Sequence, residues 1–307
     1  MKSLKILIVI AIVVTINSCS VLSKSQITNI NAFATTAEKY AAFPSEVPRQ
    51  RASLFLHERL VEVINISDAG RVNLGINKAI DNYKKLIISS DKFDLSLLLI
   101  QQYASLLTKL SANNFVDNLS SNTNSLNDNL GNLVKIANTK MTNPIPATVS
   151  DAITKVIFLV GQRLTMNKQA KALKEFIPEG QKLIVITMQN IEEAMVTMQD
   201  LLEQDKTKFT DTYTANVFMN VAKMNYLSVN QYVTGLSDFD NLELLRLQSI
   251  SAARKLSKAH AKLEKSILKK SDLKEIYAET QDFIMSMQDL YKTYGKLSNS
   301  IKKEPKN

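Results

Sequence analysis

The sequence predicts an all-α protein, an elongated helical bundle that ends in a long antiparallel, coiled-coil-like hairpin. Seven glycines and six prolines in 307 residues are too few for the many turns of a sandwich or barrel. Hydrophobic residues make up 45% of the chain, which is enough for a sizeable core. Apolar residues also recur every three, four or seven positions over long stretches, and this spacing places them on one face of a helix.

Residues 1–18 have the three parts of a secretory signal peptide. Lys2 and Lys5 give a positive start, residues 6–16 form an apolar run, and a small residue precedes Cys19. The run of about 11 residues is too short to cross a bilayer, which takes roughly 20. Removal of residues 1–18 takes two of the 38 basic residues and leaves 36 against 29 acidic ones, so the mature chain keeps a net charge of +7.

The segment Ile16-Asn17-Ser18-Cys19 resembles the lipobox of bacterial lipoproteins, a Leu/Ile-x-small-Cys motif. The resemblance implies that Cys19 is acylated and becomes the first mature residue, so that residues 19–26 form a lipidated tether to the membrane. It also implies the bacterial cell envelope, and the absence of Asp after Cys19 implies the outer membrane. A plain signal peptide with a coincidental cysteine, or an uncleaved helix, is the alternative. Because Cys19 is the only cysteine, an internal disulfide is excluded.

The N-terminal helical part is expected over residues 27–143. Its first helix starts near Ile27 and ends at Pro44 and Pro48, where the next helix begins. A third helix is expected from about Asp68 to Ile88.

A fourth helix is expected after Ser89-Ser90-Asp91, because these side chains offer N-cap oxygens. Residues 113–143 are rich in Asn, a poor helix former, yet leucines recur there every seven positions. They indicate a polar helix that depends on packing, and a loosely ordered segment is the alternative.

The C-terminal helical part is expected over residues 147–301, after a break at Asn143-Pro144-Ile145-Pro146. A helix from about Thr148 to Phe176 is expected to end at Pro178-Glu179-Gly180. We expect this part to form one continuous bundle with the N-terminal part, and residues 302–307 to be a tail.

Two seven-residue patterns of more than 50 residues follow, with a predicted turn between them at residues 237–241. Each would form a helix roughly 75–80 Å long. The short turn predicts an antiparallel hairpin, and the heptad period predicts a left-handed supercoil. Ser271-Asp272 could cap a new helix and so break the second stretch.

Basic residues are concentrated in the second stretch, between residues 246 and 274. Several fall three or four positions apart and are expected to line one helix face: Arg254, Lys258, Lys262, Lys265 and Lys269. Such a face could contact an anionic surface or an acidic protein partner. A solvated face that keeps the bundle soluble is the alternative. Export and the scarcity of interleaved aromatics disfavour nucleic acid.

Catalytic motifs are absent from the sequence. His57 and His260 are the only histidines, and neither belongs to a zinc-protease or di-iron bundle motif. No Gly-x-Ser-x-Gly elbow occurs, and the glycines stand too far apart for a phosphate-binding loop. We therefore assign no catalytic, cofactor-binding or metal-binding residue.

These observations favour a membrane-tethered, non-enzymatic helical module that binds a partner or acts as a scaffold in the envelope. The alternative is a membrane-active protein, because the long hairpin resembles the architecture of α-helical pore-forming toxins. The sequence departs from them, since no internal segment reaches 18 uncharged apolar residues. An envelope enzyme with an unrecognised site is the third possibility, and a deep polar pocket with convergent titratable groups would support it.

Overall fold

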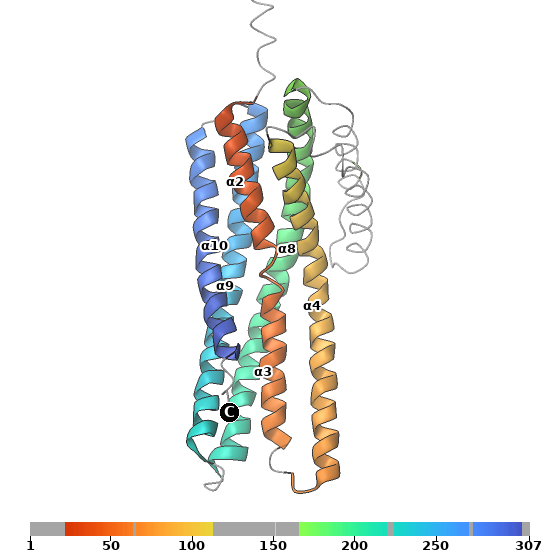
Figure 1. Cartoon of the computed structure of the whole chain (residues 1–307), viewed down its shortest axis with the longest axis vertical. Helices are drawn as coiled ribbons and strands as arrows, with labels where there is room; N and C mark the ends of the chain where they lie inside the picture. Colours follow the sequence, from red (N-terminus) through yellow and green to blue (C-terminus); the bar gives the residue numbers. More distant parts are fainter. Residues whose placement is uncertain are drawn as a thin grey trace, which may run out of the picture.

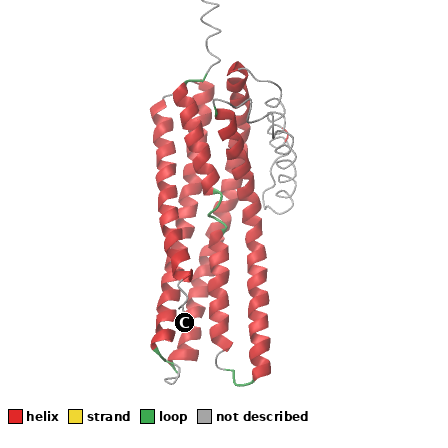
Figure 2. Ribbon diagram, in the orientation of Figure 1, coloured by secondary structure: helices red, strands yellow, loops and turns green. Residues whose placement is uncertain are grey.

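The computed structural model describes residues 22–63, 66–112, 151, 166–219, 224–269 and 273–302. Its described parts form an elongated bundle of long helices (Figure 1), and no strand occurs among them (Figure 2). This confirms the predicted all-α class. The signal peptide, Cys19, the Asn-rich segment, the break at residues 143–146 and the last five residues lie outside the described residues.

The helices run up and down along one long axis (Figure 1). Two shorter helices follow each other down one side, a long helix returns, and three further helices run down, up and down. Their bounds are α2 Lys24–Tyr40, α3 Glu46–Val63, α4 Ala69–Ser111, α8 Met166–Tyr213, α9 Tyr226–Lys269 and α10 Leu273–Lys302, and α8 is extended by the π-helical stretch η2 Thr214–Phe218.

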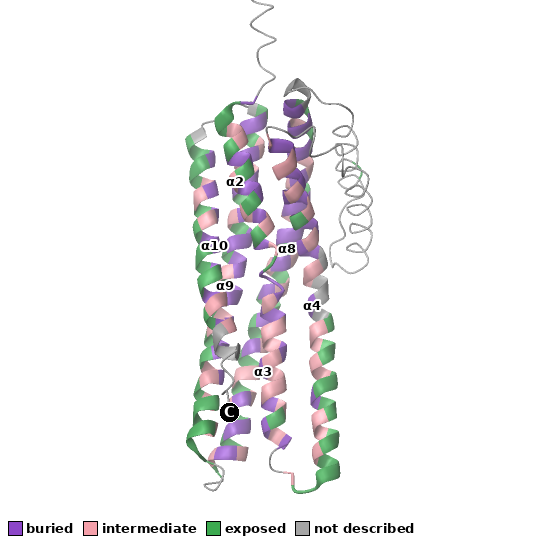
Figure 3. Cartoon of the chain, viewed as in Figure 1, coloured by how far each residue is buried: buried purple, intermediate pink, exposed green. Residues whose placement is uncertain are grey.

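One hydrophobic core extends along the bundle. α9 packs against both α8 and α10, while α2 and α3 both contact α4 and α9. The core includes residues from Leu22 to Leu297, and so draws on every long helix. Figure 3 shows that burial is concentrated in the upper half, whereas the lower half of α4 is largely exposed.

The start of the bundle follows the local signals in the sequence. Ser23 caps α2, because its hydroxyl accepts from the Gln26 amide at 3.1 Å and the Gln26 side chain accepts from the Ser23 amide at 2.9 Å. The helix ends at Tyr40, and α3 begins at Glu46 with Pro48 in its first turn, where a proline costs no helical hydrogen bond.

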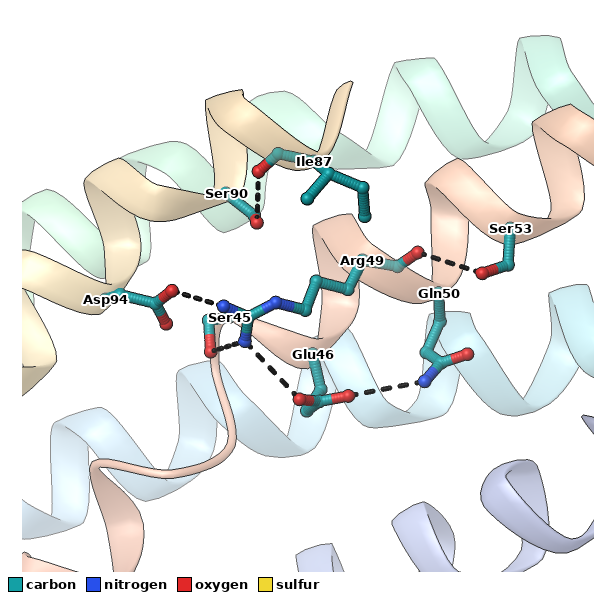
Figure 4. A network of polar contacts seen from close by, with 8 residues as sticks. All are labelled: Ser45, Glu46, Arg49, Gln50, Ser53, Ile87, Ser90 and Asp94. Carbon is teal, nitrogen blue, oxygen red and sulfur yellow. Dashed lines mark hydrogen bonds and ion pairs between the residues drawn. The ribbon is translucent and has the colours of Figure 1, made fainter. Parts of the chain in front are cut away.

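Arg49, near the start of α3, connects the junction between α2 and α3 to α4 through polar contacts (Figure 4). Its guanidinium donates to the Ser45 hydroxyl at 3.0 Å and pairs with Glu46 of its own helix and with Asp94 of α4. This network holds the start of α3 against the middle of α4.

The predicted helix boundary at residues 89–91 is wrong, because α4 continues through it without a break. Asp68 caps the whole helix and accepts from the Arg71 amide at 2.8 Å. The Ser90 hydroxyl donates to the Ile87 carbonyl at 2.6 Å (Figure 4), so it serves inside the helix instead of capping a new one.

The predicted helix end at residues 178–180 is also wrong, since α8 runs through Pro178. Apolar side chains on both sides of the proline, Phe176, Ile177, Leu183 and Ile184, are fully buried. Their burial offsets the roughly 3 kcal/mol that a proline costs inside a helix.

The long hairpin exists, but its turn lies earlier than predicted. Residues 237–241 are helical, and Phe239 is buried with its ring 5.5 Å from that of Phe209. The chain reverses instead between Phe218 and Tyr226. A reciprocal cap starts α9 there, because Asn225 accepts from the Ser228 amide at 2.9 Å while its own amide donates to the Ser228 hydroxyl.

The break considered at Ser271-Asp272 agrees with the element bounds. α9 ends at Lys269 and α10 begins at Leu273. Among the described residues, the second predicted stretch is therefore divided between α9 and α10.

Candidate functional site

The expected lipidation site, Cys19, lies outside the described residues, which begin at Leu22. Leu22 is buried and Ser23 caps α2. The Gln26 side-chain amide lies 3.5 Å from both the hydroxyl and the carbonyl oxygen of Ser266, near the end of α9. Residue 22 therefore enters at the end of the bundle where α9 terminates, and we name this the tether end.

The expected basic face is largely engaged by acids of neighbouring helices. Arg254 forms an ion pair with Glu192 of α8. The Nζ atom of Lys258 lies 2.9 Å from a Glu279 carboxylate oxygen on α10. Lys262 makes the equivalent contact with Glu275 at 2.6 Å, and this carboxylate holds the pKa of Lys262 above its usual value.

Lys265 and Arg246 of the same stretch take no part in these three pairs. Lys265 is exposed near the tether end, and the side chain of Lys269 lies outside the described residues. Arg246 is buried, where it binds Glu243 at 2.6 Å and donates to the Met195 carbonyl oxygen at 3.0 Å. The face thus forms interhelical ion pairs along its middle, where the Arg254 and Lys258 side chains stay 65 and 63% exposed, and Lys265 adds an exposed charge near the tether end.

His260 belongs to a buried hydrogen-bond chain across three helices. Its Nδ1 donates to the side-chain carbonyl oxygen of Gln181 at 2.7 Å, so its Nε2 accepts from the Tyr103 hydroxyl at 2.6 Å. Complete burial lowers the pKa of His260 to about 3 and raises the pKa of Tyr103 well above its usual value. The imidazole is therefore neutral and satisfied, as expected of a core histidine.

His57 lies in the lower half, where its Nε2 is 2.7 Å from the Tyr213 hydroxyl. The adjacent Glu58 is 2% exposed and accepts from the Thr212 hydroxyl at 3.2 Å. Burial raises the pKa of Glu58 to about 7, although Arg59 opposes the shift. The lysine nearest to this carboxylate, Lys208, is 3.9 Å away.

These polar groups connect helices and do not converge on a shared point as an acid, a base and a nucleophile would. In the described part of the chain, no three His, Cys, Asp or Glu side chains are grouped so that they could hold a metal ion. The two His–Tyr pairs join α4 to α9 and α3 to α8, which gives them a structural role.

An apolar surface that the sequence pattern did not single out lies at the other end of the bundle. Large hydrophobic side chains flank the α8–α9 turn, and we call them the distal tip. They are Met219, Met224, Tyr226, Leu227, Val229 and Val233, exposed by 78, 48, 86, 50, 39 and 58%. The predicted turn at residues 237–241 would place Met219, Tyr226, Val229 and Val233 inside the first helix of the hairpin and not beside its turn.

Among the described residues, no helix combines the length and apolar character needed to cross a bilayer. Comparison with family models, curated proteins and solved structures finds no match for this chain.

Proposed function

We propose that this chain is a lipoprotein of the bacterial envelope, a non-enzymatic rod that lipid on Cys19 holds to the outer membrane by one end. The observation that carries this proposal is the position of Leu22 at the tether end. Only two residues separate Leu22 from Cys19. Acyl chains on Cys19 would therefore keep the tether end close to the lipid, and the rod would extend away from it.

The charge of the tether end supports this orientation. Lys24 and Lys265 are exposed there, close to the point where the chain would leave the membrane. A basic residue near an anionic lipid surface contributes about 1 kcal/mol to membrane binding. The basic face then assists the anchor, and an acidic protein partner is the second candidate for the same surface.

Membrane fractionation tests the proposal. The native chain is expected in the membrane fraction after a high-salt wash, because acyl chains are not released by salt. Cys19→Ala is expected to leave that fraction. Retention of Cys19→Ala in the washed membranes, or release of the native chain by salt alone, would contradict the anchor.

The basic face is tested separately with Lys265→Glu in the Cys19→Ala background. If the face contacts anionic lipid, this variant requires less salt to lose the residual membrane contact. Lys78→Glu, an exposed lysine on the lower half of α4, is the matched control and should leave the salt dependence unchanged.

A further inference from the structure

The distal tip differs in charge from the rest of the molecule. Charged residues make up 22% of the chain, so a window of 26 residues would hold about six. The 26 residues from Thr212 to Ser237 hold one, Lys223. The tip is thus a nearly uncharged surface at one end of the rod, and the α3–α4 connection, with exposed Asp68 and Arg71, lies at the same end (Figure 1).

The tip side chains that face inward are already packed against other rings of the protein. Tyr232 packs its ring against those of Phe209, Tyr213 and Phe218, at centroid distances of 6.0, 5.3 and 5.0 Å. The outward side chains, with Tyr226 at 86% exposure, are therefore not needed to complete this aromatic core. Large apolar side chains left exposed together indicate a contact with something outside the molecule.

The composition of the tip favours lipid as that contact. Tyrosine is enriched at membrane–water interfaces, because its ring is apolar and its hydroxyl is polar. The valine, leucine and methionine side chains of the tip would strengthen membrane binding by burying apolar area in the acyl layer. An acidic group would be repelled by anionic lipid, and the window has none.

Two pairs of charged residues just behind the tip are used within the protein, whereas Asp211 at its edge is exposed. Lys206 pairs with Asp240 at 2.6 Å, and Arg51 pairs with Asp205 at 2.7 Å. Protein interfaces gain specificity from charges that complement a partner. Since these pairs are satisfied internally, the tip is better suited to a fluid apolar layer than to a defined protein surface.

From this we propose that the distal tip inserts its outward side chains into the interfacial layer of a lipid bilayer. The insertion is shallow, and it requires neither a spanning helix nor a pore. Together with the proposed anchor, it would let the rod bridge two lipid surfaces separated by its own length. The tip contact does not depend on the anchor and can fail or succeed without it.

Because the chain contains no tryptophan, a single introduced tryptophan reports on one position. The native chain carrying Tyr226→Trp is bound to plain vesicles of phosphatidylcholine and phosphatidylglycerol. Vesicles of the same composition with brominated acyl chains are then added. Tyr277→Trp, at a site 58% exposed near the start of α10 at the tether end, is the matched control.

The fluorescence of the Tyr226→Trp variant is expected to shift to the blue and be quenched by the brominated vesicles, while that of Tyr277→Trp is unchanged. When Leu227→Asn is added to the Tyr226→Trp variant, about ten times more brominated lipid is expected to be needed for the same quenching. The reason is that one apolar side chain no longer enters the bilayer. Leu247→Asn, at a similarly exposed leucine of α9 outside the tip, should have no effect.

Equal quenching of the two variants, or no quenching of Tyr226→Trp, would overturn the proposal. A blue shift of Tyr226→Trp that grows with protein concentration without lipid would also overturn it, because a second copy would then cover the tip. If the chain carries no lipid, it stays free in solution and the same readout applies. Failure of the anchor and failure of the tip are therefore separate results.

Discussion

At the scale of single residues, contacts too tight to admit one more carbon fix how the helices pack. A Cβ atom at Gly180 would lie 2.2 Å from the ring of Tyr103. That ring cannot move easily, because it stacks on Phe176 and donates to His260. Gly180 thus sets the distance between α8 and α4.

Gly180→Ala is expected to destabilise the protein by about 1–3 kcal/mol, the usual cost of overpacking a core. Gly295→Ala is the control, since a Cβ there meets nothing within 4 Å. It should stabilise α10 by about 0.5–1 kcal/mol, because alanine favours the helix more than glycine does. Denaturant unfolding of both variants measures the difference, and equal stabilities would contradict the packing.

Glu58 makes the stability depend on pH. Its folded pKa of about 7 exceeds its ordinary value of 4.5, so the folded protein binds more protons between these values. Stability is therefore lost as the pH rises from about 4.5 through 7. His260 changes the stability in the opposite direction. Its folded pKa of about 3 lies below its ordinary value of 6.5, so the stability falls as the pH drops from about 6.5.

The glutamine in Glu58→Gln does not titrate. The free energy of unfolding of this variant, relative to that of the native chain, should therefore rise by about 1–3 kcal/mol from pH 5 to pH 8. Urea unfolding at both pH values tests this. Glu193→Gln, at an exposed site on α8, should show no such change. A constant difference between the native chain and Glu58→Gln at both pH values would be inconsistent with a buried carboxylate.

At the scale of elements, the sequence predicts helices better than their ends. The caps at Asp68 and the prolines at 44 and 48 act locally, so they could be recognised from the sequence. Pro178 and residues 237–241 could not, because burial of distant partners such as Phe209 outweighs their local preference. The Asn225–Ser228 cap was a local signal that marked the true start of α9.

The position of the hairpin turn predicts two opposite proline effects. Ser237→Pro lies inside α9 and is expected to cost about 3 kcal/mol. Tyr226→Pro occupies the first position of α9, where no helical hydrogen bond is lost, and should be nearly neutral. Thermal unfolding followed by circular dichroism ranks the two variants. The reverse ranking would restore the turn to residues 237–241.

At the scale of the whole molecule, the two ends of the rod differ in chemistry. The tether end is basic and is separated from Cys19 by two residues, whereas the distal tip is apolar and nearly uncharged. The basic face was predictable from spacing, but its ion pairs with α10 were not, because they depend on the break after Lys269. In the sequence, the distal tip is visible only as the window from Thr212 to Ser237, which contains a single charged residue.

Mass spectrometry of the native protein, extracted from its own membranes, tests the anchored rod most directly. If lipid anchors the rod, the N-terminal peptide begins at Cys19 and carries the added mass of fatty-acyl chains. A Cys19 with a free thiol, or a peptide in which residues 1–18 are still attached, would contradict it.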